Sequence, residues 1–382
     1  MVREKTFVLA PDSFKESMTA KEVCIAMEKG LRKIYPSAKY IHVPMADGGE
    51  GTVQSLVDAS GGEIHSKEVT GPLGQKVTAK YGILGGGQTA AIEMASASGI
   101  HLVTKETRNP LITTTYGTGE LIRECLDRGI RRIIIGIGGS ATNDGGTGMA
   151  EALGARFLDE AGNELPRGGG SLDRLASIDT TALDDRLQHV QMIVACDVTN
   201  PLCGESGASR VFGPQKGATP EMVQTLDTNL AHYAEIVKQQ LHKDVRDLPG
   251  AGAAGGLGAG LLIFTQAVLQ KGIEMVIEYT GLKDKLAGAD IVFTGEGGID
   301  SQTRFGKTPY GVARAAQASG QKVIAVAGYL GEGIDSLYEE GFTAIFGIVP
   351  GASGLDKLLA EGPQNVERTC ENIARILKLS EF

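Results

Sequence analysis

Cysteine and histidine are sparse in this chain, and neither forms a recognisable cluster. The five cysteines are scattered, odd in number and without a Cys-x-x-Cys pair. This pattern excludes a disulfide framework or a zinc site and fits free, buried thiols in a reducing compartment. The six histidines show no metal-ligand spacing, so solvated or core positions are favoured for each. Tryptophan is absent, which excludes no class of function.

Long apolar runs and runs of basic residues are also missing. No apolar run approaches the roughly 20 residues that a membrane helix needs, and no signal-peptide segment precedes the first expected strand. We therefore expect a cytoplasmic protein without a membrane partner. A net charge of −9 without a Lys/Arg run argues against nucleic acid as a partner. An anionic small substrate stays possible, because a local potential can differ from the net charge.

Two familiar nucleotide motifs are incomplete. Gly306–Lys307–Thr308 imitates the end of a P-loop, but Ser301 stands where the motif needs its first glycine. Gly136-x-Gly138-x-x-Ala141 follows an expected strand, as a dinucleotide fingerprint does, yet Thr142–Gly148 inserts seven residues before the helix. A nicotinamide-dependent dehydrogenase stays an alternative on this match. The Gly250-x-Gly252-x-x-Gly255 match lacks a preceding strand and favours a glycine-rich helix start.

Glycine, by contrast, is abundant. The chain has 54 glycines in 382 residues, about twice the usual frequency of roughly 7%. They cluster between strand-like and helix-like segments, which indicates loops whose backbone lines a ligand. The length favours about two domains.

The most informative stretch runs from Arg131 to Gly148. An apolar segment of strand character ends in a loop with six glycines, and a helical pattern follows from Met149. Glycines let backbone amides turn toward an anion, whereas a tight strand-to-helix turn alone would need only one or two. Asp144 is a candidate metal ligand. Candidate nucleotide or phosphate contacts in the loop are Gly138, Gly139, Ser140, Thr142, Asn143, Gly145 and Gly146.

A strand–loop–helix rhythm marks both ends of the chain and predicts a parallel sheet. Between them, three alternating segments read as antiparallel strands, namely Glu63–Val69, Gln75–Leu84 and Thr89–Ala95. Residues Leu257–Leu269 read as a helix. We therefore predict a two-domain α/β fold, with a parallel-sheet domain from residues 1–62 and 285–382 around an inserted domain, 63–284, with a mixed sheet.

Acidic loops follow the expected strands. In open α/β sheets such loops converge on one crevice, and carboxylates beside glycine loops suit Mg²⁺ held together with phosphate oxygens. With Lys15 and Lys307 as charges for phosphate, this set predicts phosphoryl transfer. A single aspartate at a strand end more commonly caps a helix, but capping accounts poorly for five such loops together. They are Asp12–Lys15, Asp47–Thr52, Gly136–Gly148, Asp197–Asn200 and Thr294–Thr303.

These motifs stand in an order that resembles the bacterial glycerate kinase type-1 family over essentially the whole chain. The long central motif is highly specific, and the shorter ones gain weight from their order. The family usually reads Asp–Ser–Phe–Lys–Gly in the first motif, whereas Glu16 follows Lys15 here. The motifs are Asp12–Lys15, Met45–Thr52, Gly136–Gly148, Cys196–Leu202 and Thr294–Asp300.

The resemblance implies phosphorylation of D-glycerate with ATP and Mg²⁺, feeding glyoxylate, glucarate or galactarate breakdown into glycolysis. It also implies two α/β domains, one of them Rossmann-like, with the active site in the cleft between them. The resemblance favours 2-phosphoglycerate as the product, with 3-phosphoglycerate as the alternative. We expect a monomer or homodimer. A non-catalytic sensor of glycerate and nucleotide is a further alternative, besides the dehydrogenase.

Roles for individual residues follow from these expectations. Asp197 is the first candidate for the general base and Asp300 the second, with Lys15 as a further catalytic candidate. Further nucleotide contacts are Gly295, Gly297 and Lys307. Candidate glycerate contacts are Ser13, Lys15, Asp47 and Arg304, since a small acid requires a cation. Candidate metal ligands are Asp47, Asp144 and Glu296.

Overall fold

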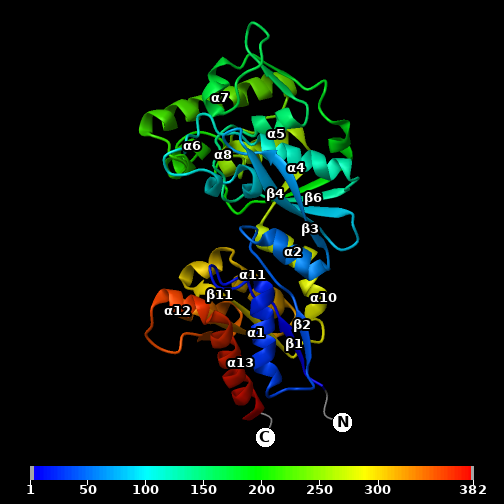
Figure 1. Cartoon of the computed structure of the whole chain (residues 1–382), viewed down its shortest axis with the longest axis vertical. Helices are drawn as coiled ribbons and strands as arrows, with labels where there is room; N and C mark the ends of the chain where they lie inside the picture. Colours follow the sequence, from blue (N-terminus) through cyan, green and yellow to red (C-terminus); the bar gives the residue numbers. More distant parts are fainter. Residues whose placement is uncertain (1–3, 380–382) are drawn as a thin grey trace. The chain divides into compact units, whose positions relative to one another are not determined.

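The computed structural model describes residues 4–379. Its chain divides into two compact units (Figure 1). Unit 1 comprises Met1–Asp47, Gln54–Gly61 and Gly272–Phe382, and unit 2 comprises Gly48–Val53 and Gly62–Lys271. Both chain ends therefore belong to one unit, and the other is an insertion. The expected α/β fold, with a parallel-sheet domain built from both chain ends and an inserted domain, is confirmed. The domain boundaries predicted from the sequence lie between residues 62 and 63 and between residues 284 and 285.

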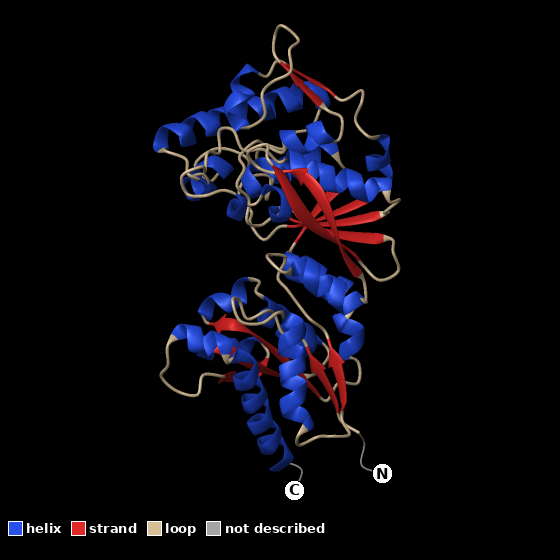
Figure 2. Ribbon diagram, viewed as in Figure 1, coloured by secondary structure: helices blue, strands red, loops and turns tan. Residues whose placement is uncertain are grey.

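Unit 1 is built on a five-stranded parallel sheet with the strand order β13-β12-β11-β1-β2 (Figure 2). Counted along the chain, this order is 2-1-3-4-5, a doubly wound arrangement of the Rossmann-like type. The order reverses between β1 and β11, and ligands of such sheets bind at the carboxyl ends of the strands beside this reversal. The strands are β1 (Thr6–Leu9), β2 (Lys39–His42), β11 (Ile291–Ile299), β12 (Lys322–Leu330) and β13 (Phe342–Gly347).

Helices α1 (Ala20–Arg32) and α13 (Gly362–Leu379) lie side by side (Figure 1). Thr19 and Glu22 form a capping box at the start of α1. The apolar faces of α1 and α13 share one buried core with β1 and β11. Their packing is close, because a Cβ on Gly30 would lie 2.2 Å from a backbone oxygen of α13. The other helices of unit 1 are α9 (Gly272–Tyr279), α10 (Leu282–Leu286), α11 (Thr308–Ala318) and α12 (Leu355–Ala360).

Unit 2 holds a six-stranded mixed sheet with the order β10-β9-β6-β5-β4-β3. The four strands from β10 to β5 run parallel, and β4 and β3 are antiparallel as the alternating segments predicted. A separate hairpin pairs β7 (Arg156–Leu158) with β8 (Ser177–Asp179). The sheet strands are β3 (Glu63–Thr70), β4 (Lys76–Ile83), β5 (Thr89–Glu93), β6 (Arg132–Gly136), β9 (Gln191–Ala195) and β10 (Ala267–Gln270).

Helix α2 (Thr52–Ser60) begins in unit 2 and continues in unit 1. The predicted helix over Leu257–Leu269 is wrong in its second half, because α8 (Ala253–Phe264) ends early and β10 pairs with β9. A short apolar run fits a buried strand as well as a helix, and here pairing decides. The remaining helices of unit 2 are α3 (Ala95–Ser98), α4 (Tyr116–Asp127), α5 (Thr147–Ala152), α6 (Ala208–Phe212) and α7 (Pro220–Leu241).

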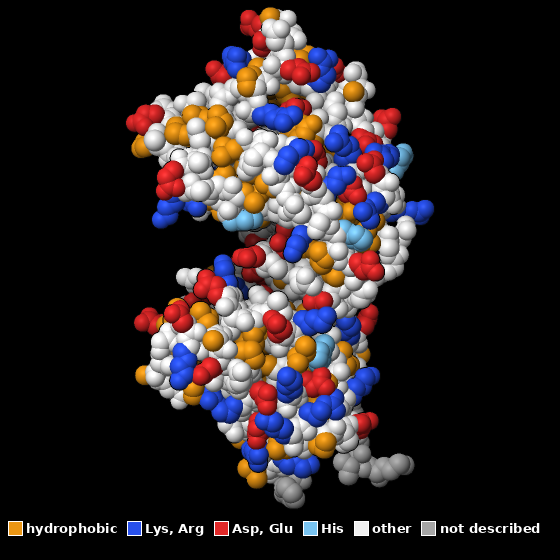
Figure 3. Space-filling view, in the orientation of Figure 1, with side chains coloured by type: hydrophobic (Ala, Val, Ile, Leu, Met, Phe, Trp, Pro, Cys, Tyr) orange, Lys and Arg blue, Asp and Glu red, His pale blue; other side chains and the backbone are white. Residues whose placement is uncertain are grey.

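The five cysteines are free thiols, four of them buried and Cys196 partly exposed. Acidic and basic side chains are interspersed on the face of the molecule in Figure 3. Among residues 4–379, no helix combines the length and the apolar character needed to cross a membrane.

Candidate active site

The strand-order reversal in unit 1 carries a half-buried carboxyl group, Asp12, three residues after the end of β1. Its amide donates to the carbonyl of Gly295 at 2.8 Å, which fastens the loop to β11. Its carboxylate accepts from the amide of Ser13 at 2.6 Å and from the hydroxyls of Ser13 and Thr308. Burial raises the pKa of Asp12 to about 6, against the opposing effect of the Thr308 hydrogen bond. The sequence analysis singled out this loop but assigned no role to Asp12 or Thr308, because an aspartate after a strand looks like an ordinary cap.

Glu296 projects from the carboxyl end of β11 beside this aspartate. Its Oε1 accepts from the hydroxyl of Thr303 at 3.1 Å and pairs with Lys307 Nζ at 3.4 Å. Burial raises the pKa of Glu296 to about 7, and the charge of Asp12 adds to the effect. Lys307 also donates to the carbonyl of Gly298 at 3.3 Å. Glu296 and Lys307, named from the sequence for metal and phosphate, are therefore brought together.

Asp47 follows β2 at the same edge of the sheet, and its charge contributes to the raised pKa of Asp12. In unit 1, Asp12 therefore lies within electrostatic reach of both Asp47 and Glu296. These carboxyl groups do not form a complete metal-binding site, because among the described residues no three Asp, Glu, His or Cys side chains are placed to hold a metal ion. Any cation here would need oxygen ligands from outside the protein as well.

The loop after β11 is shaped by Asp300. Its carboxylate accepts from the amide of Gln302 at 2.8 Å and forms a capping box with Thr303 at the short helix Ser301–Phe305. Arg304 is exposed and lies over the ring of Phe305, with 4.8 Å from Cζ to the ring centroid. Lys15 is also exposed, and its amide is the nearest neighbour that a Cβ on Gly297 would meet, at 3.6 Å. Asp300 therefore has a capping role, the commoner alternative for such a residue.

Residues 48–53, from the second motif, belong to unit 2. Glu93, at the end of β5, accepts a hydrogen bond from the amide of Val53 at 3.0 Å. Burial raises the pKa of Glu93, and the amides of Gly51, Thr52 and Val53 oppose that shift. This glutamate fixes the glycine-rich segment against the sheet and was not identified from the sequence, because nothing local marks it.

The long glycine loop of unit 2 follows β6, and only its first part is accessible. Gly138 and Gly139 are exposed and Ser140 is 8% exposed, whereas Thr142, Asn143 and Asp144 are fully buried. The exposed residues Gly138 and Gly139, with the nearly buried Ser140 beside them, are therefore the part of the loop that can meet a ligand.

Gly145 and Gly146, assigned from the sequence to phosphate binding, are explained by packing instead. Both have positive φ, 65° and 77°, where glycine is favoured. The amide of Gly145 donates to the carbonyl of Gly255 at 3.0 Å, and a Cβ on Gly146 would lie 2.9 Å from Cα of Gly260. The loop lies against α8, so that side chains at these positions would prevent the contact.

Asp144 is enclosed in the same half of the loop. Its Oδ2 accepts from the amide and hydroxyl of Thr115, at 2.8 and 2.9 Å, and from the amide of Gly148 at 3.3 Å. Its Oδ1 accepts from the amide of Gly146 at 3.1 Å. Burial raises the pKa of Asp144 while these bonds oppose the shift. The carboxylate fastens the loop to the start of α4, and its complete burial disfavours the metal-ligand role expected from the sequence.

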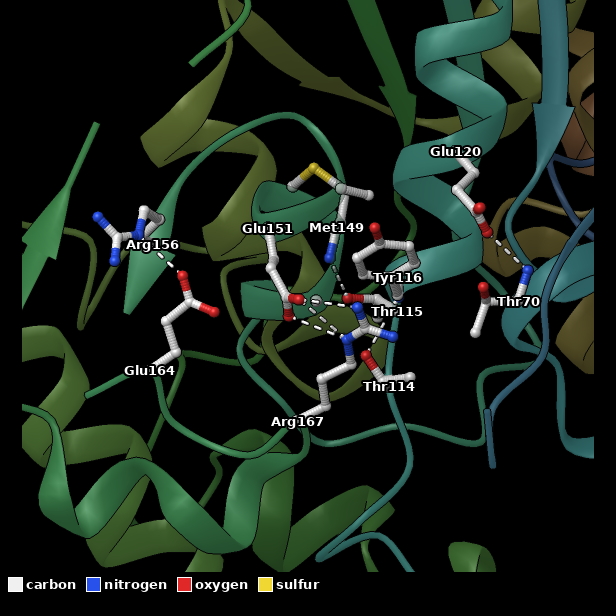
Figure 4. A network of polar contacts seen from close by, with 12 residues as sticks. Thr70, Thr114, Thr115, Tyr116, Glu120, Met149, Glu151, Arg156, Glu164 and Arg167 are labelled. Carbon is white, nitrogen blue, oxygen red and sulfur yellow. Dashed lines mark hydrogen bonds and ion pairs between the residues drawn. The ribbon is translucent and has the colours of Figure 1, made fainter. Parts of the chain in front are cut away.

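Figure 4 shows the surroundings of this junction. The hydroxyl of Thr115 accepts from the amide of Met149 at 2.9 Å, which joins the starts of α4 and α5. Arg167 pairs with Glu151 at 2.8 Å and lies over the ring of Tyr116, with 3.5 Å from Cζ to the ring centroid. These contacts hold Thr115 and Tyr116, at the start of α4, in place beside the glycine loop.

Lys216 is a buried cation beneath the loop. Its Nζ donates to Ser140 Oγ and to the carbonyl of Thr142, both at 2.6 Å. Burial lowers its pKa to about 7, and the charge of Asp144 opposes the shift. Asn143 donates through Nδ2 to Ser209 Oγ at 2.9 Å. Lys216 was not identified from the sequence, because it lies 76 residues after Ser140 and belongs to no motif.

Asp197 lies on the exposed segment that follows β9. Strands β6 and β9 are parallel neighbours, with Gly136 opposite Ala195, and neighbouring strands are about 4.8 Å apart. The segments that carry Gly138 and Asp197 therefore leave the same edge of the sheet side by side. Unit 2 thus brings together the accessible glycine segment and the candidate base.

Comparison with known proteins assigns the family. The model of the glycerate kinase family matches residues 7–378. A Haemophilus influenzae protein named glycerate kinase is 54% identical over 371 residues, 97% of this chain and 98% of its own. An Escherichia coli protein named glycerate 2-kinase is 52% identical over 372 residues, 97% of this chain and 98% of its own.

A crystal structure from Salmonella typhimurium, described under the name glycerate kinase 2, has the same fold. It superposes with a TM-score of 0.92 at 52% identity and covers 99% of this chain and 100% of its own. The similarity spans both units. This chain therefore belongs to the glycerate kinase family and is a kinase, a phosphotransferase that acts on an alcohol group.

Proposed function

We propose that this protein transfers the γ-phosphoryl group of ATP to D-glycerate and forms 2-phosphoglycerate. The observation that carries the proposal is the full-length similarity to proteins named glycerate kinase and, for the position of the phosphate, to one named glycerate 2-kinase at 52% identity. The expected motifs lie at the carboxyl ends of strands in both units, where α/β sheets bind ligands.

The carboxyl groups of unit 1 fit a magnesium ion. Burial raises the pKa of Asp12 and of Glu296, the charge of Asp47 adds to the shift of Asp12, and the charge of Asp12 adds to that of Glu296; a divalent cation relieves such repulsion. Mg²⁺ commonly binds one or two carboxylates and completes its shell with water and phosphate oxygens, which agrees with the incomplete metal-binding site. We assign Asp47 and Glu296 as its ligands, with Asp12 beside them, and leave Asp144 out. When bound, the ion neutralises charge on the transferred phosphate.

The phosphates and the glycerate need amides and cations. Gly138 and Gly139 are the exposed residues of the glycine loop, and Ser140 follows them with 8% of its surface exposed; we assign these three residues to phosphate oxygens. Lys307 is held beside Glu296 by its ion pair, and we place it near the phosphates together with the Gly295–Gly297 backbone. For the glycerate carboxylate, the exposed cations Lys15 and Arg304 are the candidates, with Ser13 adjacent.

The proton of the accepting hydroxyl goes to Asp197 in this proposal. The hydroxyl oxygen of glycerate attacks the γ-phosphorus, the bond to the bridging oxygen breaks, and ADP leaves. Asp197 supports this role because it is exposed beside the glycine segment. Asp300 is less suited, since its carboxylate caps the helix at Ser301–Phe305.

The direct test is ADP release measured with D-glycerate, with L-glycerate as the control. We expect turnover with the D isomer and a requirement for Mg²⁺. Binding of ATP and glycerate without ADP release would favour the sensor, and NADH binding with no ATP binding would favour the dehydrogenase. Either outcome would overturn the proposal.

A further inference from the structure

Lys216 presents an unusual combination of burial and charge under the accessible part of the glycine loop. The side chain is 2% exposed, yet it belongs to a residue type that is rarely buried without a partner. The two hydrogen bonds of its ammonium group go to neutral oxygens, Ser140 Oγ and the carbonyl of Thr142, while the buried Asp144 acts on it through its charge. Burying a charge costs free energy unless the charge is well paired and hydrogen-bonded, so the position of Lys216 requires an explanation.

The bond to Ser140 fixes the direction of a hydroxyl proton. An ammonium group has only donors, so Ser140 Oγ must accept from Lys216, and its own O–H must donate to a different acceptor. Ser140 borders Gly138 and Gly139, the exposed residues of the loop. Lys216 thereby turns Ser140 into a donor at the edge of the sheet where a ligand has access.

The second bond holds the backbone of the loop. By accepting from Lys216, the carbonyl of Thr142 is fixed two residues beyond Ser140. Two neighbouring polar atoms, Thr142 Oγ1 and Asn143 Oδ1, are buried with no hydrogen-bond partner among the described residues. Two buried polar atoms of this stretch are therefore unsatisfied, although Lys216 and Ser209 already hold it.

We propose that Lys216 is a positioning residue for phosphate: it orients the Ser140 hydroxyl as a donor, fixes Gly138–Thr142, and places a positive charge beneath the bound anion. This inference rests on the proposed function, since it assigns the ATP phosphates to this loop. Lys216 is itself too buried to touch the ligand and acts through Ser140 and the backbone.

The test replaces Lys216 with Met, an unbranched side chain one atom shorter, which removes the charge and its hydrogen bonds. We expect the KM for Mg-ATP to rise about 10- to 100-fold, the loss typical of a hydrogen bond to a charged group. We expect kcat to fall less and the thermal midpoint to stay close to that of the wild type. Lys243→Met is the matched control, because Lys243 is a partly buried lysine of unit 2 that donates to the carbonyls of Leu262 and Ile263, at the end of α8. It should leave the KM for Mg-ATP unchanged.

A cycle with Ser140→Ala tests the route through the hydroxyl. In the Ser140→Ala background, Lys216→Met should raise the KM by a clearly smaller factor than in the wild type. Independent, multiplying effects would overturn the Ser140 route. Lys216→Gln, which keeps a donor without the charge, serves if the Met variant does not fold, and we expect an intermediate KM. Wild-type KM in Lys216→Gln would overturn the role of the charge.

Binding of a non-hydrolysable ATP analogue, measured by titration calorimetry, separates this inference from the proposed function. An unchanged analogue Kd in Lys216→Met, with an active wild type, would overturn the inference and leave the kinase proposal standing. A wild type that binds the analogue through Lys216 but phosphorylates no glycerate would overturn the proposed function and support the phosphate role.

Discussion

Among single residues, Glu16 has a backbone conformation that disfavours its own side chain. Its φ is 64°, in the left-handed region, where a residue with a Cβ costs about 1–3 kcal/mol. The related family motif that this chain resembles has glycine at the same position. The departure seen in the sequence thus places backbone strain in the loop.

We therefore expect Glu16→Gly to raise the free energy of unfolding by about 1 kcal/mol. Urea denaturation followed by circular dichroism measures the change. Glu16→Ala is the control, since it removes the carboxylate but keeps the strain, and it should give no comparable gain. A Glu16→Gly protein less stable than the wild type would show that Glu16 makes a favourable contact that outweighs the strain.

Asp197 is the residue on which the chemistry most depends. A general base typically contributes about 10²–10⁴-fold, so Asp197→Asn should lower kcat by that factor and leave the KM for ATP nearly unchanged. Steady-state kinetics with both substrates measures the two effects.

Asp300→Asn is the matched control for this prediction. Asparagine is as good an N-cap as aspartate, so this variant should keep near-wild-type turnover. A large loss of kcat in Asp300→Asn with little loss in Asp197→Asn would reverse the two assignments.

At the scale of the elements, Glu124 links three parts of unit 2. Its carboxylate accepts from Lys67 on β3 at 2.7 Å, from Tyr81 on β4 at 3.1 Å, and from Arg128 at the end of α4 at 2.7 Å. The hydrogen bonds from Lys67 and Arg128 lower the pKa of Glu124 to about 2. Because the cationic partners are partly exposed, solvent screens their contribution.

This network predicts a pH-dependent stability. A carboxyl whose pKa falls from 4.5 to about 2 on folding stabilises the protein above pH 4.5, and the contribution disappears as the pH falls toward 2. Glu124→Gln should lower the free energy of unfolding by about 1–2 kcal/mol at pH 7. Thermal midpoints of the two proteins should then converge below pH 4.5. A constant difference across this range would show that the ionised form is not what stabilises the junction.

The elements also show which features could be predicted from the sequence. The order of strand, loop and helix and the alternation of apolar and polar residues are local patterns. The parallel strands and the segments β3, β4 and β5 could therefore be predicted from the sequence. Residues 267–270 form strand β10 because they pair with β9, which the local sequence does not reveal. Glycine is needed at positions 145 and 146 because α8 lies against them, and this contact also forms only in the folded protein. Lys216 and Glu93 reach their partners only through tertiary folding, so no local pattern marks them.

At the scale of the whole molecule, the chain builds its doubly wound sheet from strands at its two ends. Strands β1 and β11 are almost 300 residues apart in sequence and pair directly, Phe7 with Ile291, which places the Asp12 and Glu296 loops side by side. The inserted unit adds the glycine loop and Asp197 on its own sheet. Each unit thus contributes strand-end loops suited to one part of a phosphoryl transfer.

The proposed formation of 2-phosphoglycerate from ATP and D-glycerate is tested most directly by a proton-coupled phosphorus NMR spectrum of the product. In 2-phosphoglycerate the phosphorus couples to the single proton on C2, and in 3-phosphoglycerate it couples to two protons on C3. We predict a doublet that grows with ADP. A triplet would assign the phosphate to the other hydroxyl, and the absence of any phosphate ester signal would contradict the kinase account of this site.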